Sequence, residues 1–78
     1  MSKIEEELQK EIAKWLPKAK AEVKKIKKVN DEEFLVNIKA YIKDTEYFLE
    51  KGDLVKGFEA VVWSWAWLEI GKLKGILK

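Results

Sequence analysis

Hydrophobic residues recur every three or four positions along most of the chain, the spacing of one face of an α-helix. Three such stripes cover about residues 2–28, 31–51 and 54–74. No segment alternates with a period of two, so no strand is expected. The pattern predicts an all-α three-helix bundle that forms a single domain over residues 1–78.

Residues typical of helix ends separate the three stripes. Ser2 with Glu5, and Asn30 with Glu33, have the spacing of a capping box. In this motif the side chain of each residue accepts a hydrogen bond from the backbone N–H of the other. Gly52 suits the left-handed residue after a helix, and an aspartate follows it. The connection at Gly52 is very short, so we expect the second and third helices to form an antiparallel hairpin.

Pro17 lies inside the first stripe, where it removes one backbone hydrogen bond and disfavours helical geometry at Leu16. Either one helix bends at Pro17 or a new helix begins there. Because the hydrophobic stripe keeps its phase across the proline, we expect a single long helix kinked near Pro17.

The third helix is apolar around most of its circumference. A helical wheel predicts a core-facing side made of Phe58, Val61, Val62, Trp65 and Leu68. Trp63 and Trp67 fall on the opposite side, with Ile70 beside them. Three explanations are open for this second side: residues 2–16 cover it, another protein chain contacts it, or it lines a pocket for a hydrophobic small molecule.

A set of small residues runs between these two sides of the third helix, and it consists of Gly57, Ala60, Ser64 and Gly71. Small side chains let a neighbouring helix approach closely, so we include this set in the expected interface. The other explanation is that both glycines are simply tolerated near the helix ends.

Glu69 falls on the predicted core-facing side, where an unpaired carboxylate would be costly. If Glu69 is buried, we expect a partner such as the Tyr41 hydroxyl. The alternative is that the core-facing side ends at this depth and Glu69 reaches solvent.

Composition argues against most enzyme chemistry. The 78 residues include 16 lysines and 14 acids but no arginine, histidine or cysteine. Thiolate and imidazole nucleophiles, bases and metal ligands are therefore absent. We expect no enzymatic activity, no cofactor and no metal site, and the acids around Gly52 are explained by helix capping.

Six lysines on the first helix give a locally basic segment, namely Lys18, Lys20, Lys24, Lys25, Lys27 and Lys28. On the wheel they spread over half the helix and complete its polar side, which favours a solvated surface. Nucleic-acid binding is the alternative, weakened by the lack of arginine for bidentate contacts.

No apolar run is long enough to cross a membrane, and the first residues do not resemble a signal peptide. A cytoplasmic location is therefore expected. The predominance of lysine and glutamate over asparagine and glutamine is similar to thermophile composition.

The segment from Tyr47 to Asp53, Tyr-Phe-Leu-Glu-Lys-Gly-Asp, followed by Trp65 to Gly71, resembles a family of small archaeal proteins, the domain of unknown function 357. The resemblance covers about residues 15–75. It departs at Thr45, where alanine is usual, and at Glu69 and Ile70, where Asp-Ala is usual. It implies an all-helical bundle and an archaeal source, but no activity and no catalytic residues.

These observations favour a non-enzymatic interaction module, which self-associates as a homodimer or binds a protein partner through the side carrying Trp63 and Trp67. The alternative hypothesis is an accessory protein that binds a small ligand near Glu69 or nucleic acid through the lysines of the first helix.

Overall fold

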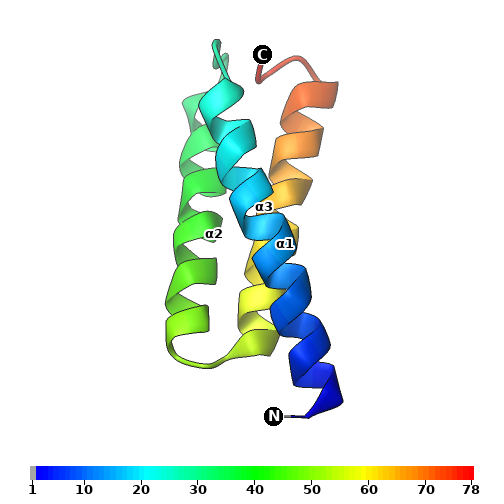
Figure 1. The fold of residues 1–78 in the computed structure, drawn as a ribbon. Helices are drawn as coiled ribbons and strands as arrows, with labels where there is room; N and C mark the ends of the chain where they lie inside the picture. Colours follow the sequence, from blue (N-terminus) through cyan, green and yellow to red (C-terminus); the bar gives the residue numbers. More distant parts are fainter. Residues whose placement is uncertain (1) are drawn as a thin grey trace.

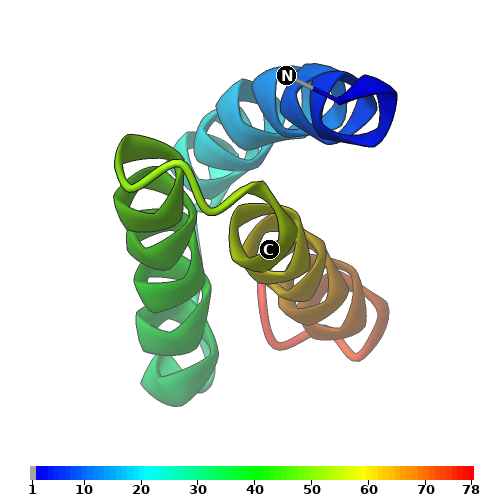
Figure 2. The same cartoon turned by 90° about the horizontal axis from the view of Figure 1, so that it is seen from below.

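The computed structural model describes residues 2–78, which form three α-helices around a shared core (Figure 1). They are α1 (Lys3–Lys25), α2 (Glu32–Glu50) and α3 (Leu54–Leu73). The α2 and α3 helices form the antiparallel hairpin, and α1 lies mainly on α3, with less contact to α2 (Figures 1 and 2). The predicted all-α three-helix bundle is confirmed, with a long dimension of 42 Å.

Most of the expected helix ends are found. Ser2 and Glu5 form the complete capping box at the start of α1. Gly52 has a φ of 75°, and the Asp53 carboxylate accepts from the backbone N–H of Lys56 at the start of α3. The predicted cap at Asn30 is wrong, because Asp31 caps α2 through the backbone N–H of Glu33.

The first helix ends earlier than predicted because the residues after it pair with the end of the chain. We call residues 74–78 the C-terminal clasp. Gly75 takes a positive φ of 71°, and Leu77 forms an antiparallel bridge with Val29. The Asn30 side-chain amide donates to the Gly75 carbonyl at 2.9 Å, so Asn30 holds the clasp instead of capping α2.

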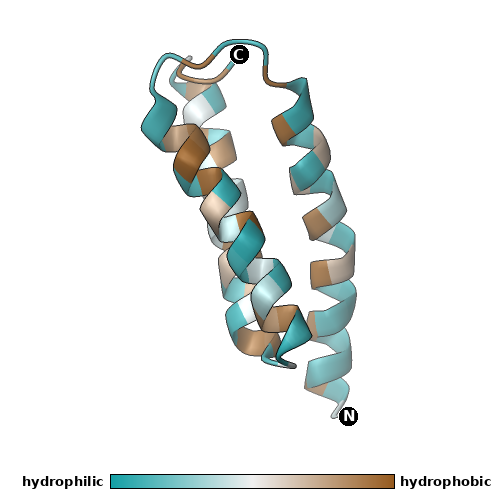
Figure 3. Ribbon diagram, turned by 90° about the vertical axis from the view of Figure 1, so that its left-hand side faces the viewer, coloured by the Kyte–Doolittle hydropathy of each residue, from teal (hydrophilic) through white to brown (hydrophobic). Residues whose placement is uncertain are grey.

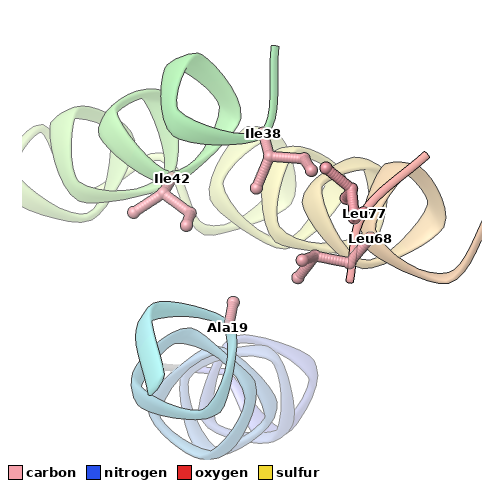
Figure 4. Packing of buried hydrophobic residues seen from close by; sticks show 5 residues of the cluster. All are labelled: Ala19, Ile38, Ile42, Leu68 and Leu77. Carbon is pink, nitrogen blue, oxygen red and sulfur yellow. The ribbon is translucent and has the colours of Figure 1, made fainter. Parts of the chain in front are cut away.

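The core consists of two clusters of buried hydrophobic side chains. The larger one draws Ala19 from α1, Ile38 and Ile42 from α2, Leu68 from α3 and Leu77 from the C-terminal clasp (Figure 4). The second, near the turn between α2 and α3, contains Ile12, Leu54 and Val61. Every helix and the clasp therefore contribute to burial.

The α1 helix is amphipathic, and hydrophobic residues repeat among polar ones along its length (Figure 3). It runs through Pro17 as one continuous helix, and Pro17 is exposed. Because Pro17 is exposed, its ring displaces no packed side chain, although it removes one backbone hydrogen bond of the helix. The bend expected at Pro17 stays a prediction.

Candidate functional site

One side of α3 remains exposed although it is largely apolar. We call it the outer face of α3, and its large hydrophobic members are Val55, Val62, Trp63, Ile70 and Leu73. Two exposed acids, Glu59 and Glu69, lie on the same helix. Neither of these carboxylates takes part in an ion pair within residues 2–78. The outer face is therefore an apolar surface with acidic groups.

The core-facing side of α3 differs from the one that the wheel predicted. Val62, expected in the core, is 48% exposed, and Val55 is also exposed. The buried side is formed largely by the small residues, together with Leu54, Val61 and Leu68. The wheel failed because α3 is apolar all round, so hydrophobicity alone does not distinguish its sides.

The four small residues do not belong to an exposed interface, and that prediction is corrected. Gly57, Ala60, Ser64 and Gly71 are buried inside the chain. A Cβ on Gly57 would lie 3.3 Å from Ile12 and 3.6 Å from Phe48, and one on Gly71 would lie 2.5 Å from Leu77. The expected close approach is present, but the neighbours are α1, α2 and the C-terminal clasp of the same chain.

Trp63 and Trp67 have different environments instead of forming one exposed pair. Trp67 is half-buried and packs edge-on against Phe34 of α2, with ring centroids 4.8 Å apart. Trp63 is 51% exposed and stacks on Tyr41, with centroids 6.3 Å apart. Trp63 and the exposed Ile70 thus remain candidates for contact with a partner, whereas Trp67 belongs to the fold.

Residues 2–16 do not provide the cover over Trp63 that one explanation required. Their hydrophobic side chains, Leu8, Ile12 and Trp15, pack instead beside Phe58 and Trp65. The N-terminal half of α1 therefore covers a different side of α3.

The prediction that Glu69 is buried against Tyr41 is wrong. Glu69 is exposed, and the Tyr41 ring packs on Trp63. Because the core-facing side of α3 is rotated relative to the prediction, Glu69 lies at its edge and its carboxylate stays hydrated. The alternative interpretation, in which Glu69 reaches solvent, is confirmed.

A surface cavity of about 330 Å³, which we call the α1–α3 hollow, lies beside the outer face. Its lining comprises Glu11, Trp15, Phe58, Val61, Val62, Trp65, Ala66 and Glu69. The Trp15 indole N–H donates to the Glu11 carboxylate at 2.9 Å. The Trp65 indole N–H donates to the Trp15 carbonyl at 3.1 Å. These two bonds fix both indole rings in position.

The sequence predicted Trp65 on the core-facing side of α3 and, as an alternative hypothesis, a small-ligand site near Glu69, but it did not indicate which residues of α1 line this cavity. Glu11 and Trp15 are four residues apart, which puts them on the same side of a helix. This spacing was the sequence signal for one edge of the hollow. Glu69 lies at the opposite edge of the hollow only because α1 crosses α3.

The six lysines of the predicted basic segment are all exposed, and five of them make different local contacts. Lys20 pairs with Glu46 of α2 at 2.5 Å. The Lys25 ammonium lies 3.7 Å from Glu22, and the Lys18 ammonium lies 5.1 Å from the Trp15 ring centroid. Lys27 and Lys28 donate their backbone N–H groups to the carbonyl of Lys78.

Glu22 connects α1 to α3 through an ion pair with Lys72. The hydrogen bond and the positive charge of Lys72 lower the pKa of the Glu22 carboxyl from 4.5, and Lys25 adds to this effect. The charged form of Glu22 is thus favoured by folding.

Within residues 2–78, no group of three acidic side chains is placed to hold a metal ion. No helix in this part of the chain combines the length and the hydrophobicity that a membrane crossing requires.

Comparison with known proteins places the chain in a family. Among curated proteins, none is significantly similar. A crystal structure of a protein from Archaeoglobus fulgidus, assigned to the DUF357 family, superposes with a TM-score of 0.90. The two sequences are 57% identical over 96% of each chain. The family model described as Protein of unknown function (DUF357) matches residues 3–77, so the chain belongs to this family, as the resemblance in its hairpin indicated.

Proposed function

We propose that the protein is a non-enzymatic helical interaction module that binds a partner protein through the outer face of α3. The observation that carries this proposal is the concentration of exposed hydrophobic side chains on one helix. Among residues 2–78, eight large hydrophobic residues are exposed, and five of them belong to the outer face. Contiguous apolar surface of this kind on a small protein is typical of a contact site.

Charge favours a partner with a basic helix over a second copy of this chain. Two α3 helices can pair antiparallel with Val55 opposite Leu73 and Val62 opposite Ala66. In that register, Glu59 of one copy lies at the level of Glu69 of the other. A parallel pairing sets each acid against its own copy. A partner helix with lysines beside its apolar residues would replace this repulsion by attraction.

The test uses a labelled synthetic helix of about 18 residues, long enough to cover most of α3, with leucines on one side and lysines beside them. A second peptide carries glutamates in place of the lysines. Fluorescence anisotropy should show binding of the lysine peptide and at least about tenfold weaker binding of the glutamate peptide.

The variant Val62→Lys with Ile70→Lys should weaken binding of the lysine peptide by at least about tenfold, because it puts charge into the contact. Val36→Lys with Tyr47→Lys is the matched control, since Val36 and Tyr47 are 62% and 55% exposed but lie on α2. Circular dichroism verifies that each variant is folded. Equal binding of both peptides, or equal loss in the control, would contradict the proposal.

A further inference from the structure

The polar side chains of the α1–α3 hollow are unusual. Every side-chain polar group there that is still free to bind a ligand is a hydrogen-bond acceptor. The only side-chain N–H donors in its lining are the indoles of Trp15 and Trp65. Both already donate, to the Glu11 carboxylate and to the Trp15 carbonyl. The remaining side-chain polar atoms are the carboxylate oxygens of Glu11 and Glu69, which act only as hydrogen-bond acceptors when the groups are ionised. Because these oxygens are negatively charged when ionised, the hollow suits a ligand that carries positive charge.

Three aromatic rings line the same cavity. Trp15 and Trp65 meet edge to face, with centroids 5.5 Å apart and planes at 80°, and Phe58 lies beside them. Aromatic faces attract ammonium groups, and tryptophan attracts them most strongly. In this chain the ammonium groups of Lys14 and Lys18 each lie 5.1 Å from the Trp15 ring centroid, although neither lysine lines the hollow.

From the aromatic rings, the two carboxylates and the engaged indole donors, we propose that the α1–α3 hollow binds an organic ammonium cation. The alkyl part of the cation packs against Phe58 and the tryptophans, and the charged nitrogen lies toward Glu11 and Glu69. The volume of about 330 Å³ fits a small ligand, at the lower end of ordinary binding pockets. This site goes beyond the proposed function, because it needs no protein partner.

The experiment titrates the protein with tetramethylammonium chloride and with neopentyl alcohol, a neutral molecule of nearly the same shape, at constant ionic strength. Nuclear magnetic resonance follows the indole N–H signals of Trp15 and Trp65. The ammonium ion should shift both signals, and the alcohol should not. Equal shifts with both probes, or no shift at about 10 mM ammonium, would overturn the proposal.

Charge-removing variants locate the site. Glu11→Gln and Glu69→Gln should each weaken ammonium binding about two- to fivefold, as expected for one partly exposed charge contact. Glu59→Gln is the matched control, because Glu59 is an exposed acid on the same helix that does not line the hollow. If Glu59→Gln weakens ammonium binding as much as Glu69→Gln does, the binding reflects general charge attraction, and the proposed site is overturned.

The ammonium group has two sources, a free amine or a lysine side chain of a bound protein, and Glu11→Gln distinguishes them. Glu11 lines the hollow from α1 and is not part of the outer face of α3. If the source is a partner's lysine, this variant weakens binding of the leucine–lysine peptide as well as of tetramethylammonium. If only the free amine binds, the variant weakens tetramethylammonium binding and leaves peptide binding unchanged. A peptide that fails to bind the parent protein removes the proposed function and leaves the ammonium site standing.

Discussion

Gly71 illustrates how one residue of this fold is determined by a distant segment. Leu77 is almost completely buried, and its side chain occupies the space where a Cβ on Gly71 would lie. Gly71 does not need a special backbone conformation, because its φ is not positive. Its small size is required by the C-terminal clasp, a contact that no local pattern around Gly71 predicts.

Glu22 provides a pH-dependent prediction at the same scale. Because Lys72 lowers its pKa in the folded state, Glu22 stabilises the fold at neutral pH, above its unfolded pKa. This contribution is lost as the pH falls through the lowered folded value. Glu22→Gln should therefore lower the melting temperature at about pH 7, and the difference from the parent should shrink as the pH falls below 4.5 through the lowered folded pKa.

Thermal unfolding followed by circular dichroism over that pH range measures this effect. Glu69→Gln is the control, since Glu69 has no ion pair in residues 2–78. A difference between parent and Glu22→Gln that persists unchanged in acid would show that the carboxylate charge is not the cause.

At the scale of elements, α3 has the least amphipathic sequence in the bundle and is also the central helix. It packs on both α1 and α2, so two sides need apolar or small residues. The remaining side is the outer face, which stays largely exposed and apolar, and of which Trp63 stacks on Tyr41 of α2. The side of a helix that is buried is then decided by which neighbours fit against it, and small residues permit the closest fit.

The C-terminal clasp is a second element whose importance can be measured. Leu77→Ala should lower the free energy of unfolding by about 2–5 kcal/mol, as expected for removing a buried leucine. Leu73→Ala is the matched control, because Leu73 is 87% exposed a few residues earlier, and it should change stability by less than about 0.5 kcal/mol.

Urea denaturation gives both free energies. Similar values for the two variants would mean that the clasp does not contribute to the cooperative core. Because Leu77 joins side chains from all three helices in one cluster, we expect a single transition in the parent protein.

For the whole molecule, the acids of the outer face predict its oligomeric state. Repulsion between Glu59 and Glu69 of two copies should keep the isolated protein largely monomeric at neutral pH. The double variant Glu59→Gln with Glu69→Gln should self-associate more strongly, because the same apolar surface remains and the repulsion is removed.

Sedimentation at several protein concentrations measures this. A matched double variant on α2, Glu32→Gln with Glu50→Gln, removes two exposed acids away from the outer face and should remain monomeric. A parent protein that already dimerises tightly would show that a second copy, and not a basic helix, occupies the outer face.

The sequence by itself determined the number of helices, the hairpin at Gly52, the capping of α1 and α3 and the family, because these features depend on neighbouring residues. Only the tertiary structure showed that Trp67 packs on Phe34, that Glu69 is exposed and that the small residues are buried. It also revealed the C-terminal clasp and the residues that line the α1–α3 hollow. The physical reason is that an apolar helix such as α3 has several sides of nearly equal hydrophobicity. The choice among them depends on the shape of the segments that pack against it.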